Sequence, residues 1–153
     1  MHRIVIADTS FLITIHRLQL FNEIRTLYKE ICITKKIAEE FQLDLPHWII
    51  IQEHENLQAQ AVLSIVLDPG EASAIALAYN YQDVTIIIDD LKARKKAIAL
   101  GFKITGTLGV LFKLKQEGLI SSLKQKISQL AEIGFRISPK IIEEMLRTAG
   151  EEL

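Results

Sequence analysis

Two short runs of apolar residues in this 153-residue chain each end directly in carboxylates. The β-branched run Ile86–Ile88 is followed by Asp89 and Asp90, and a strand predicted over residues 3–7 is followed by Asp8. Continuous apolar runs are typical of parallel strands that are covered on both faces. Because the carboxyl ends of parallel strands meet at the ligand-binding edge of an open α/β sheet, we expect these acids to lie together.

Converging carboxylates repel one another, so such a cluster destabilises the fold unless a cation neutralises it. Oxygen ligands without His or Cys select hard ions such as Mg²⁺ or Mn²⁺. Two such ions about 3.5–4 Å apart can activate water and stabilise the leaving oxygen when a phosphodiester is cleaved. The residue types therefore favour metal-dependent phosphodiester hydrolysis.

Helix capping is the alternative role for most of these acids. Asp8, Asp68, Glu71 and Asp90 all lie at or near the start of a predicted helix. A carboxylate at that position stabilises a helix by about 0.5–2 kcal/mol and needs no further function. Asp89 is the least suited to capping, because it directly follows the buried strand and its neighbour already fills the cap position. Both interpretations stay open at this stage.

The elements that must position these acids alternate along the chain. Strands are predicted over residues 3–7, 30–33, 48–52, 86–88 and 103–105. Helices are predicted over residues 9–21, 22–28, 56–66, 71–81, 91–100, 107–116, 119–132 and 138–148, with a further one opening at Thr34. This alternation without hairpin signals predicts a three-layer α/β/α sandwich with a mainly parallel, Rossmann-like sheet. By length, residues 1–153 are expected to form a single domain.

The net charge of −1 is unevenly spread. Residues 1–90 hold 6 Lys and Arg against 13 Asp and Glu, whereas residues 91–140 hold 11 against 2. A basic half beside a carboxylate cluster suits a polyanionic substrate, which the cations hold while a metal sits on the acids. The alternative is that each lysine simply belongs to the solvated face of an amphipathic helix.

The basic helix predicted over residues 91–100 carries part of this positive charge. At 3.6 residues per turn, Arg94 points away from the face that three lysines share. These lysines are Lys92, Lys95 and Lys96. We expect the lysine face to hold substrate phosphates and Arg94 to reach back towards the acidic site.

Cysteine content and hydropathy indicate a cytoplasmic protein. Cys32 is the only cysteine, so we expect a small buried hydrophobe in a reducing compartment rather than a disulfide. No apolar run is long enough to span a membrane, and the strand that begins at residue 3 predicts that there is no signal peptide. The four histidines show no zinc-ligand spacing with the cysteine.

Five segments in order resemble the PIN-domain family, over about residues 3–148. They are Asp8-Thr9-Ser10, Ile37-x-x-Glu40-Phe41, Pro69-Gly70-Glu71 with its alanine run, Ile88-Asp89-Asp90 with Arg94, and Thr105-Gly106-Thr107. More narrowly, the chain resembles small prokaryotic PIN-like proteins with Asp-Pro-Gly-Glu and Thr-Gly-Thr signatures. The resemblance implies a Rossmann-like sheet and Mg²⁺- or Mn²⁺-dependent cleavage of RNA. It also implies a homodimer that is often the toxin of a toxin–antitoxin pair, with an antitoxin protein as partner.

Residue by residue, the resemblance matches Asp8 to the first acid of the family and Glu40 to its helix acid, with Glu39 as the weaker alternative. Glu71 takes a position that is usually Asp in the family, and because its side chain is longer, the resemblance does not fix the geometry of a second metal. The alignment does not separate Asp89 from Asp90. The expected catalytic residues are Asp8, Glu40, Glu71, Asp89 and Asp90, of which Asp8, Glu71, Asp89 and Asp90 are the expected metal ligands. The expected substrate-binding residues are Thr9, Lys92, Arg94, Lys95, Lys96 and Thr107, the last also supporting the metal site.

Two other function classes compete with an RNA-directed nuclease. The first is a binding module that keeps the fold but has weak or no catalysis. The second is a phosphoryl-transfer domain, which the sequence disfavours because no second Asp stands two positions after Asp8. For self-association, the last predicted helix offers an apolar stripe, although burial within the monomer explains that stripe equally well. The stripe consists of Ile141, Ile142, Met145 and Leu146.

Overall fold

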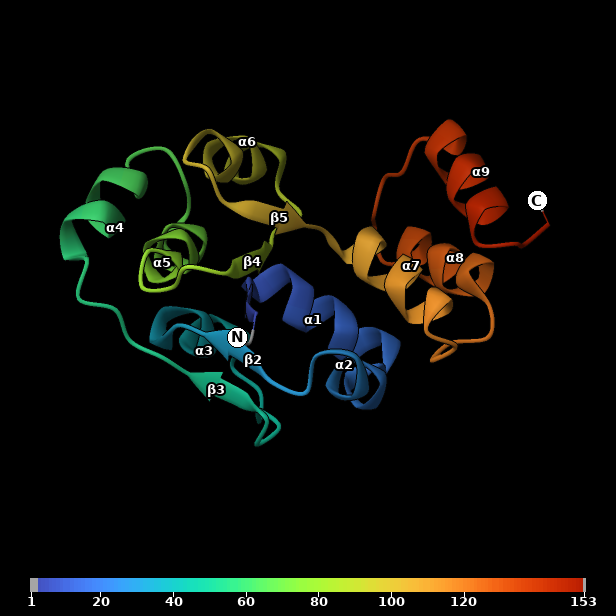
Figure 1. Cartoon of the computed structure of the whole chain (residues 1–153), viewed down its shortest axis with the longest axis horizontal. Helices are drawn as coiled ribbons and strands as arrows, with labels where there is room; N and C mark the ends of the chain where they lie inside the picture. The colour runs from blue at the N-terminus through green and yellow to red at the C-terminus, as the bar shows by residue number, and fades with distance from the viewer. Residues whose placement is uncertain (1–2, 153) are drawn as a thin grey trace.

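The computed structural model describes residues 3–152, which form a five-stranded sheet and the helices around it (Figure 1). The strands are β1 (Ile4–Ala7), β2 (Ile31–Ile33), β3 (Ile49–Ile51), β4 (Val84–Ile87) and β5 (Lys103–Thr105). The first helices are α1 (Thr9–Leu18), α2 (Phe21–Tyr28), α3 (Lys35–Phe41), α4 (Leu57–Leu63) and α5 (Pro69–Ala78). The remaining helices are α6 (Leu91–Ala99), α7 (Thr107–Gln116), α8 (Leu123–Glu132) and α9 (Pro139–Thr148).

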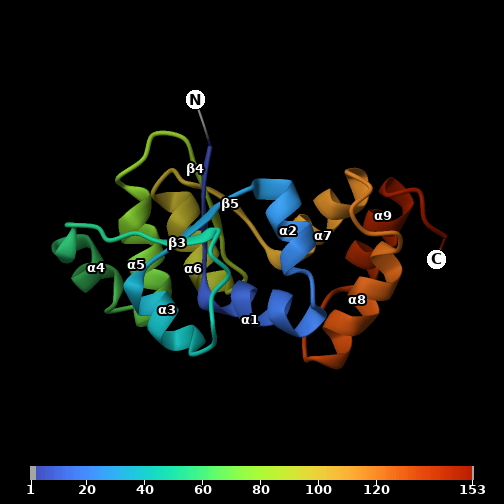
Figure 2. The same ribbon diagram turned by 90° about the horizontal axis from the view of Figure 1, so that it is seen from below.

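The sheet has the strand order β3-β2-β1-β4-β5, and every pair of neighbouring strands is parallel. Helices flank this sheet, so the predicted three-layer α/β/α sandwich with a parallel sheet is confirmed. Figure 2 shows the same arrangement from below, with α4 at one end of the molecule and α8 and α9 at the other.

The strand register aligns the residues that follow each strand. Ala7 pairs with Ile87, so Asp8 is level with Ile88 at the end of β4. Ile33 pairs with Ile51, which places Thr34 and Gln52 side by side at the ends of β2 and β3. Because all strands run in one direction, these residues share the carboxyl edge of the sheet.

The centre of the core is the helix α5, which packs on β1 and β4 and against α3, α4 and α6. All residues from Gly70 to Ala78 are buried, including four alanines. A helix that is buried all round needs small side chains to approach its neighbours closely, which explains the alanine-rich sequence. The strands beneath it are filled by β-branched residues, and Ile6, Ile86 and Ile87 are fully buried.

Several predicted boundaries were wrong. The helix after Asp8 ends at Leu18 rather than at residue 21, because Gln19 takes a left-handed conformation with φ 57° and terminates it. The helix predicted over residues 71–81 begins earlier, at Pro69, and ends at Ala78, since proline is well suited to the first position of a helix. Helix α8 begins at Leu123 rather than at residue 119.

The C-terminal apolar stripe is largely used within the chain. Leu146 is buried, and Ile142 and Met145 are partly buried against the core, whereas Ile141 remains 47% exposed. Cys32 is buried and free, as predicted. Within residues 3–152, none of the helices has the length and apolar character needed to cross a bilayer.

Candidate active site

Asp8 lies at the centre of the carboxyl edge, between the end of β1 and the start of α1, and is only 4% exposed. Although Asp8 occupies the N-cap position, its side chain forms no bond that caps α1. Burial raises the pKa of Asp8 to about 7, a hydrogen bond from the Thr9 backbone opposes this rise, and the charges of neighbouring carboxylates reinforce it. These neighbours are Asp68, Glu40 and Asp89. The sequence placed Asp8 correctly at a strand end, but capping does not account for its side chain.

Glu71 approaches the same region from the first turn of α5. It forms a capping box with Asp68: the Glu71 backbone N–H donates to Asp68 Oδ1 at 2.9 Å, and the Asp68 N–H donates to Glu71 Oε1 at 3.4 Å. The capping interpretation therefore holds for this pair. Yet Glu71 is also buried, and this burial, with the charges of Asp68, Asp8 and Asp90, raises its pKa to about 8. Glu71 thus caps the helix and also has a carboxyl group whose ionised form is disfavoured by burial and by its acidic neighbours.

Glu40 reaches the cluster from α3 and is held by a hydroxyl group. Thr9 Oγ1 donates to Glu40 Oε1 at 2.7 Å. A side chain at Gly70 would collide with this carboxylate, so the Pro-Gly start of α5 leaves the space that Glu40 occupies. The neighbouring Glu39 is exposed and lines a separate cavity.

The two consecutive aspartates after β4 have different partners. Asp89, which is half-buried, accepts hydrogen bonds from the Thr107 backbone N–H at 2.7 Å and from Thr107 Oγ1 at 2.5 Å. Asp90 is exposed and caps α6, because its Oδ2 accepts from the Ala93 N–H at 3.0 Å. Asp89 adds to the charge felt by Asp8, and Asp90 adds to that felt by Glu71. Both aspartates therefore remain candidates for the last acid.

Arg94 turns back from α6 towards the strand end, where its Nη1 donates to the Ile88 carbonyl at 2.9 Å. A Cβ at Gly106 would lie 2.7 Å from Arg94 Nη1 and 2.9 Å from Asp89 Oδ1, so this glycine admits both side chains. Beside them opens a cavity of about 580 Å³ with mostly apolar walls. The lysines predicted to bind substrate, Lys92, Lys95 and Lys96, are all exposed on α6.

Within residues 3–152, no ion pair neutralises the carboxylates of this region. The donor set is entirely oxygen, which fits a hard divalent cation. However, no three acidic, histidine or cysteine side chains of the described chain are arranged closely enough to enclose a metal ion. Each carboxylate is instead engaged by a hydroxyl or backbone N–H group. The chemistry of the site suits Mg²⁺ or Mn²⁺, and an ion would have to draw the side chains together.

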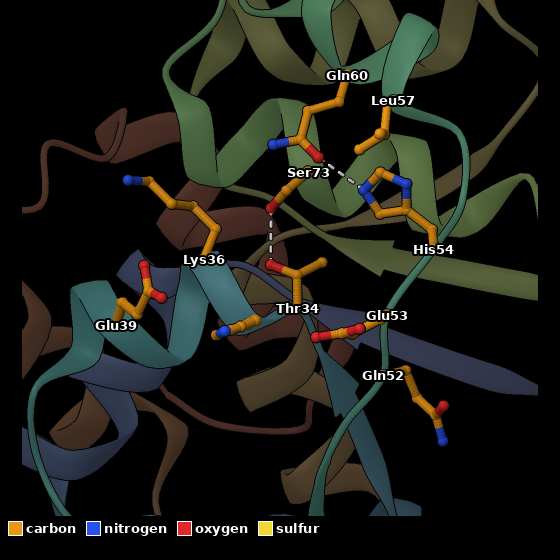
Figure 3. Close-up of a pocket in the computed structure, with 10 residues that line it drawn as sticks. Thr34, Lys36, Glu39, Gln52, Glu53, His54, Leu57, Gln60 and Ser73 are labelled. Atoms are coloured by element: carbon orange, nitrogen blue, oxygen red, sulfur yellow. Dashed lines mark hydrogen bonds between the residues drawn. The ribbon is translucent and has the colours of Figure 1, made fainter.

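Two parts of this edge were missed from the sequence. Asp68 had been considered only as a helix cap, although its charge contributes to the pKa of both Asp8 and Glu71. The second part is a polar cavity of about 360 Å³ (Figure 3). Thr34 and Gln52, which line it, follow β2 and β3. The rule that located Asp8, a polar residue directly after a buried strand, applies to Thr34 after β2, whereas β3 before Gln52 is only partly buried. Neither residue is charged, so neither was considered as a ligand.

The raised pKa of Asp8 predicts how the stability of the metal-free protein depends on pH. The protonated form is favoured in the folded state, so its stabilising contribution is complete below about pH 4 and is lost as the pH rises through about 7. The variant Asp8→Asn stays neutral throughout. In EDTA at pH 8 we expect this variant to exceed the parent in free energy of unfolding by about 2–4 kcal/mol, with the difference vanishing near pH 4.

Urea unfolding of both proteins from pH 4 to pH 8 measures this difference. Asp44→Asn, the same change at an exposed loop position, is the control and should follow the parent. If Asp8→Asn is less stable than the parent at pH 8, the Asp8 carboxylate is a structural group rather than a buried, uncompensated charge.

Comparison with known protein families identifies one family that covers nearly the whole chain. A family model described as a PIN domain matches residues 4–151. Neither curated proteins nor solved structures give a match. PIN domains are a nuclease-type fold, generally bind nucleic acid and typically use divalent metal ions. The resemblance predicted from the sequence motifs is thus confirmed, and the chain belongs to the PIN-domain family.

Proposed function

We propose that this protein is a Mg²⁺- or Mn²⁺-dependent endoribonuclease that cleaves RNA phosphodiesters. The observation that carries the proposal is the burial of Asp8 and Glu71, which form no ion pair within residues 3–152 and whose pKa values are raised to about 7 and about 8, mainly by burial. Ionisation of these buried carboxyl groups is unfavourable in a site that only stabilises the fold, whereas a bound divalent ion makes their ionised form favourable. Membership of the PIN-domain family supports a nuclease over other metal-dependent functions.

In this proposal Asp8, Glu71 and one or both of Asp89 and Asp90 hold the metal. A divalent ion bound there supplies the positive charge that neutralises these acids and polarises the phosphodiester. Glu40, oriented by Thr9, lies beside them and is placed to accept a proton from the attacking water.

Thr107 and Arg94 have supporting roles. Thr107 orients Asp89 through two hydrogen bonds, which fixes the direction in which its carboxylate can bind. Arg94 holds the Ile88 carbonyl directly before the two aspartates. Its guanidinium is thereby positioned next to the acidic edge, where it can contact a substrate phosphate.

A catalytically weak binding module is the second candidate. The observation in its favour is that the carboxylates are held by protein hydrogen bonds and no three of the described acids enclose an ion. Under this alternative the same surface binds RNA or a protein partner without cleaving it. The role of toxin, with an antitoxin protein as partner, applies to either candidate and would be supported by an adjacent gene for a small DNA-binding protein.

Cleavage of a labelled single-stranded RNA tests the first candidate. We expect cleavage with Mn²⁺ or Mg²⁺, none with EDTA, and a loss of at least about a hundredfold in Asp8→Asn and Glu40→Gln. Asp44→Asn, purified in the same way, should keep the parent activity. Glu39→Gln decides between the two adjacent glutamates. Cleavage that survives in Asp8→Asn would point to a contaminating nuclease, and RNA binding without any cleavage would favour the binding module.

The lysine face of α6 is expected to contact phosphates. Replacing Lys95 and Lys96 by glutamine should weaken RNA binding and reduce the slope of log affinity against log salt by about 1.4, since each phosphate contact to a single strand contributes about 0.7. Fluorescence anisotropy in EDTA at several salt concentrations measures this slope. The control is the same double change at Lys124 and Lys140, which are exposed on α8 and α9. An equal slope in both variants would assign the α6 lysines to a merely solvated surface.

We expect the protein to form a homodimer. The described surface carries exposed apolar side chains on and after α4, with Val62 at 65% and Ile65 at 81% exposure. Apolar residues exposed to this degree in neighbouring positions are typical of association surfaces. Light scattering should give about twice the monomer mass of 17.3 kDa at tens of micromolar. A monomer mass for the parent, unchanged by Ile65→Glu, would contradict the dimer.

A further inference from the structure

The polar cavity in Figure 3 opens at the same edge of the sheet as the acidic site. Thr34 and Gln52 line it, and the register places them level with Asp8, one and two strands away. Neighbouring strands are about 4.8 Å apart, so the cavity lies roughly 5–10 Å along the edge from Asp8. One or two nucleotides of a single strand can span this distance.

A chain of hydroxyl groups forms the wall between the cavity and the acidic site. Ser73 Oγ donates to the Gly70 carbonyl at 2.7 Å, which leaves Thr34 Oγ1 as the donor in its 2.7 Å bond to Ser73. Gly70 in turn abuts the Glu40 carboxylate on the other side. The first turn of α5 is therefore shared, with Glu40 on one side and the cavity on the other.

One wall of the cavity carries an oriented hydrogen-bond donor. The His54 Nδ1 accepts from the Asn56 backbone N–H at 3.1 Å, so the ring proton is on Nε2. The His54 Nε2 then donates to Gln60 Oε1 at 2.7 Å. This bond fixes the Gln60 amide with its NH₂ group directed away from His54, as Figure 3 shows.

The opposite wall carries charged groups that are free of ion pairs within the described chain. The Glu53 carboxylate points towards Thr34 in Figure 3, and Lys36 and Glu39 extend from α3 at the margin. The cavity thus presents an amide donor on one side and a carboxylate acceptor on the other. Lys36 adds a cation at its margin.

We propose that this cavity is a subsite for an unpaired guanine base of the RNA that the acidic site cleaves. Single-stranded RNA is read by hydrogen bonds to the edges of splayed-out bases and by stacking on side chains such as histidine. Guanine places an acceptor, O6, beside two donors, the N1–H and the exocyclic amino group. The Gln60 NH₂ group can donate a hydrogen bond to O6, and the two carboxylate oxygens of Glu53 can accept hydrogen bonds from the N1–H and the amino group. Uracil, cytosine and adenine lack two adjacent donors on that edge.

This inference rests on the proposed RNA substrate but not on cleavage, so its test is a binding measurement in EDTA. The probes are labelled uridine oligomers with a single guanosine, inosine or adenosine at one internal position. Inosine lacks the amino group that Glu53 would accept. We expect the guanosine oligomer to bind about tenfold more tightly than the adenosine one, and inosine to lose most of this preference.

The variant Gln60→Glu can still accept the His54 bond but replaces the NH₂ donors with oxygen, so it should abolish the preference for guanosine. Gln58→Glu makes the same charge change on an exposed position of α4 and should keep it. Equal affinity for all oligomers, a preference for another base, or loss of the preference in both variants would overturn the subsite. Cleavage without base preference refutes only the subsite, whereas guanosine preference without cleavage refutes only the nuclease.

Discussion

The structure depends on carboxyl groups that gather at the carboxyl ends of two parallel strands and form no ion pair with Lys, Arg or His within residues 3–152. Asp8 ends β1, and Asp89 and Asp90 follow β4, so the pairing of Ala7 with Ile87 brings like charges together by necessity. The fold tolerates them because hydroxyl and backbone N–H groups take the place of counter-ions: Thr9 donates to Glu40, and Thr107 donates to Asp89. Burial raises the pKa of Asp8 by more than the hydrogen bond from the Thr9 backbone lowers it, and the charges of neighbouring carboxylates add to the rise.

Capping and site formation are therefore not exclusive alternatives here. Asp68, Glu71 and Asp90 each accept a hydrogen bond from a backbone N–H at the start of a helix. The charges of Asp68 and Asp90 also raise the pKa of Glu71, and that of Asp68 raises the pKa of Asp8. The helix starts are what bring the acids to this edge, since α5 and α6 both begin there. A metal ion that binds must compete with these bonds, so the same interactions that preorganise the carboxylates also limit how far they can converge.

The strand pattern was predictable because buried parallel strands require unbroken apolar runs, and the acids were predictable because they interrupt those runs. The remaining features depend on tertiary contacts. The separation of Glu39 from Glu40 is set by how α3 packs on α1 and α5, and not by helical period alone. The end of α1 depends on a left-handed Gln19, a conformation that a sequence without Gly or Asn at that position does not signal. The polar cavity is assembled from α3, α4, α5 and the segment after β3, so no pattern within a single segment of the sequence predicts it.

The acidic and basic parts of the sequence form different parts of the sheet edge. The acidic first ninety residues supply β3, β2, β1 and β4, whereas the basic segment supplies α6, β5 and α7. The strand order therefore places the lysines of α6 on one side of the carboxylates and the polar cavity on the other. Under the proposed function, an RNA strand that crosses the carboxylates perpendicular to the β-strands would meet cations on one side, where contacts to phosphates are independent of sequence. On the other side it meets the cavity, where the Gln60 amide and the Glu53 carboxylate can discriminate between bases and Lys35 and Lys36 can contact a phosphate. In this arrangement the lysines of α6 would provide affinity, the carboxylates would provide cleavage, and the cavity would provide sequence preference.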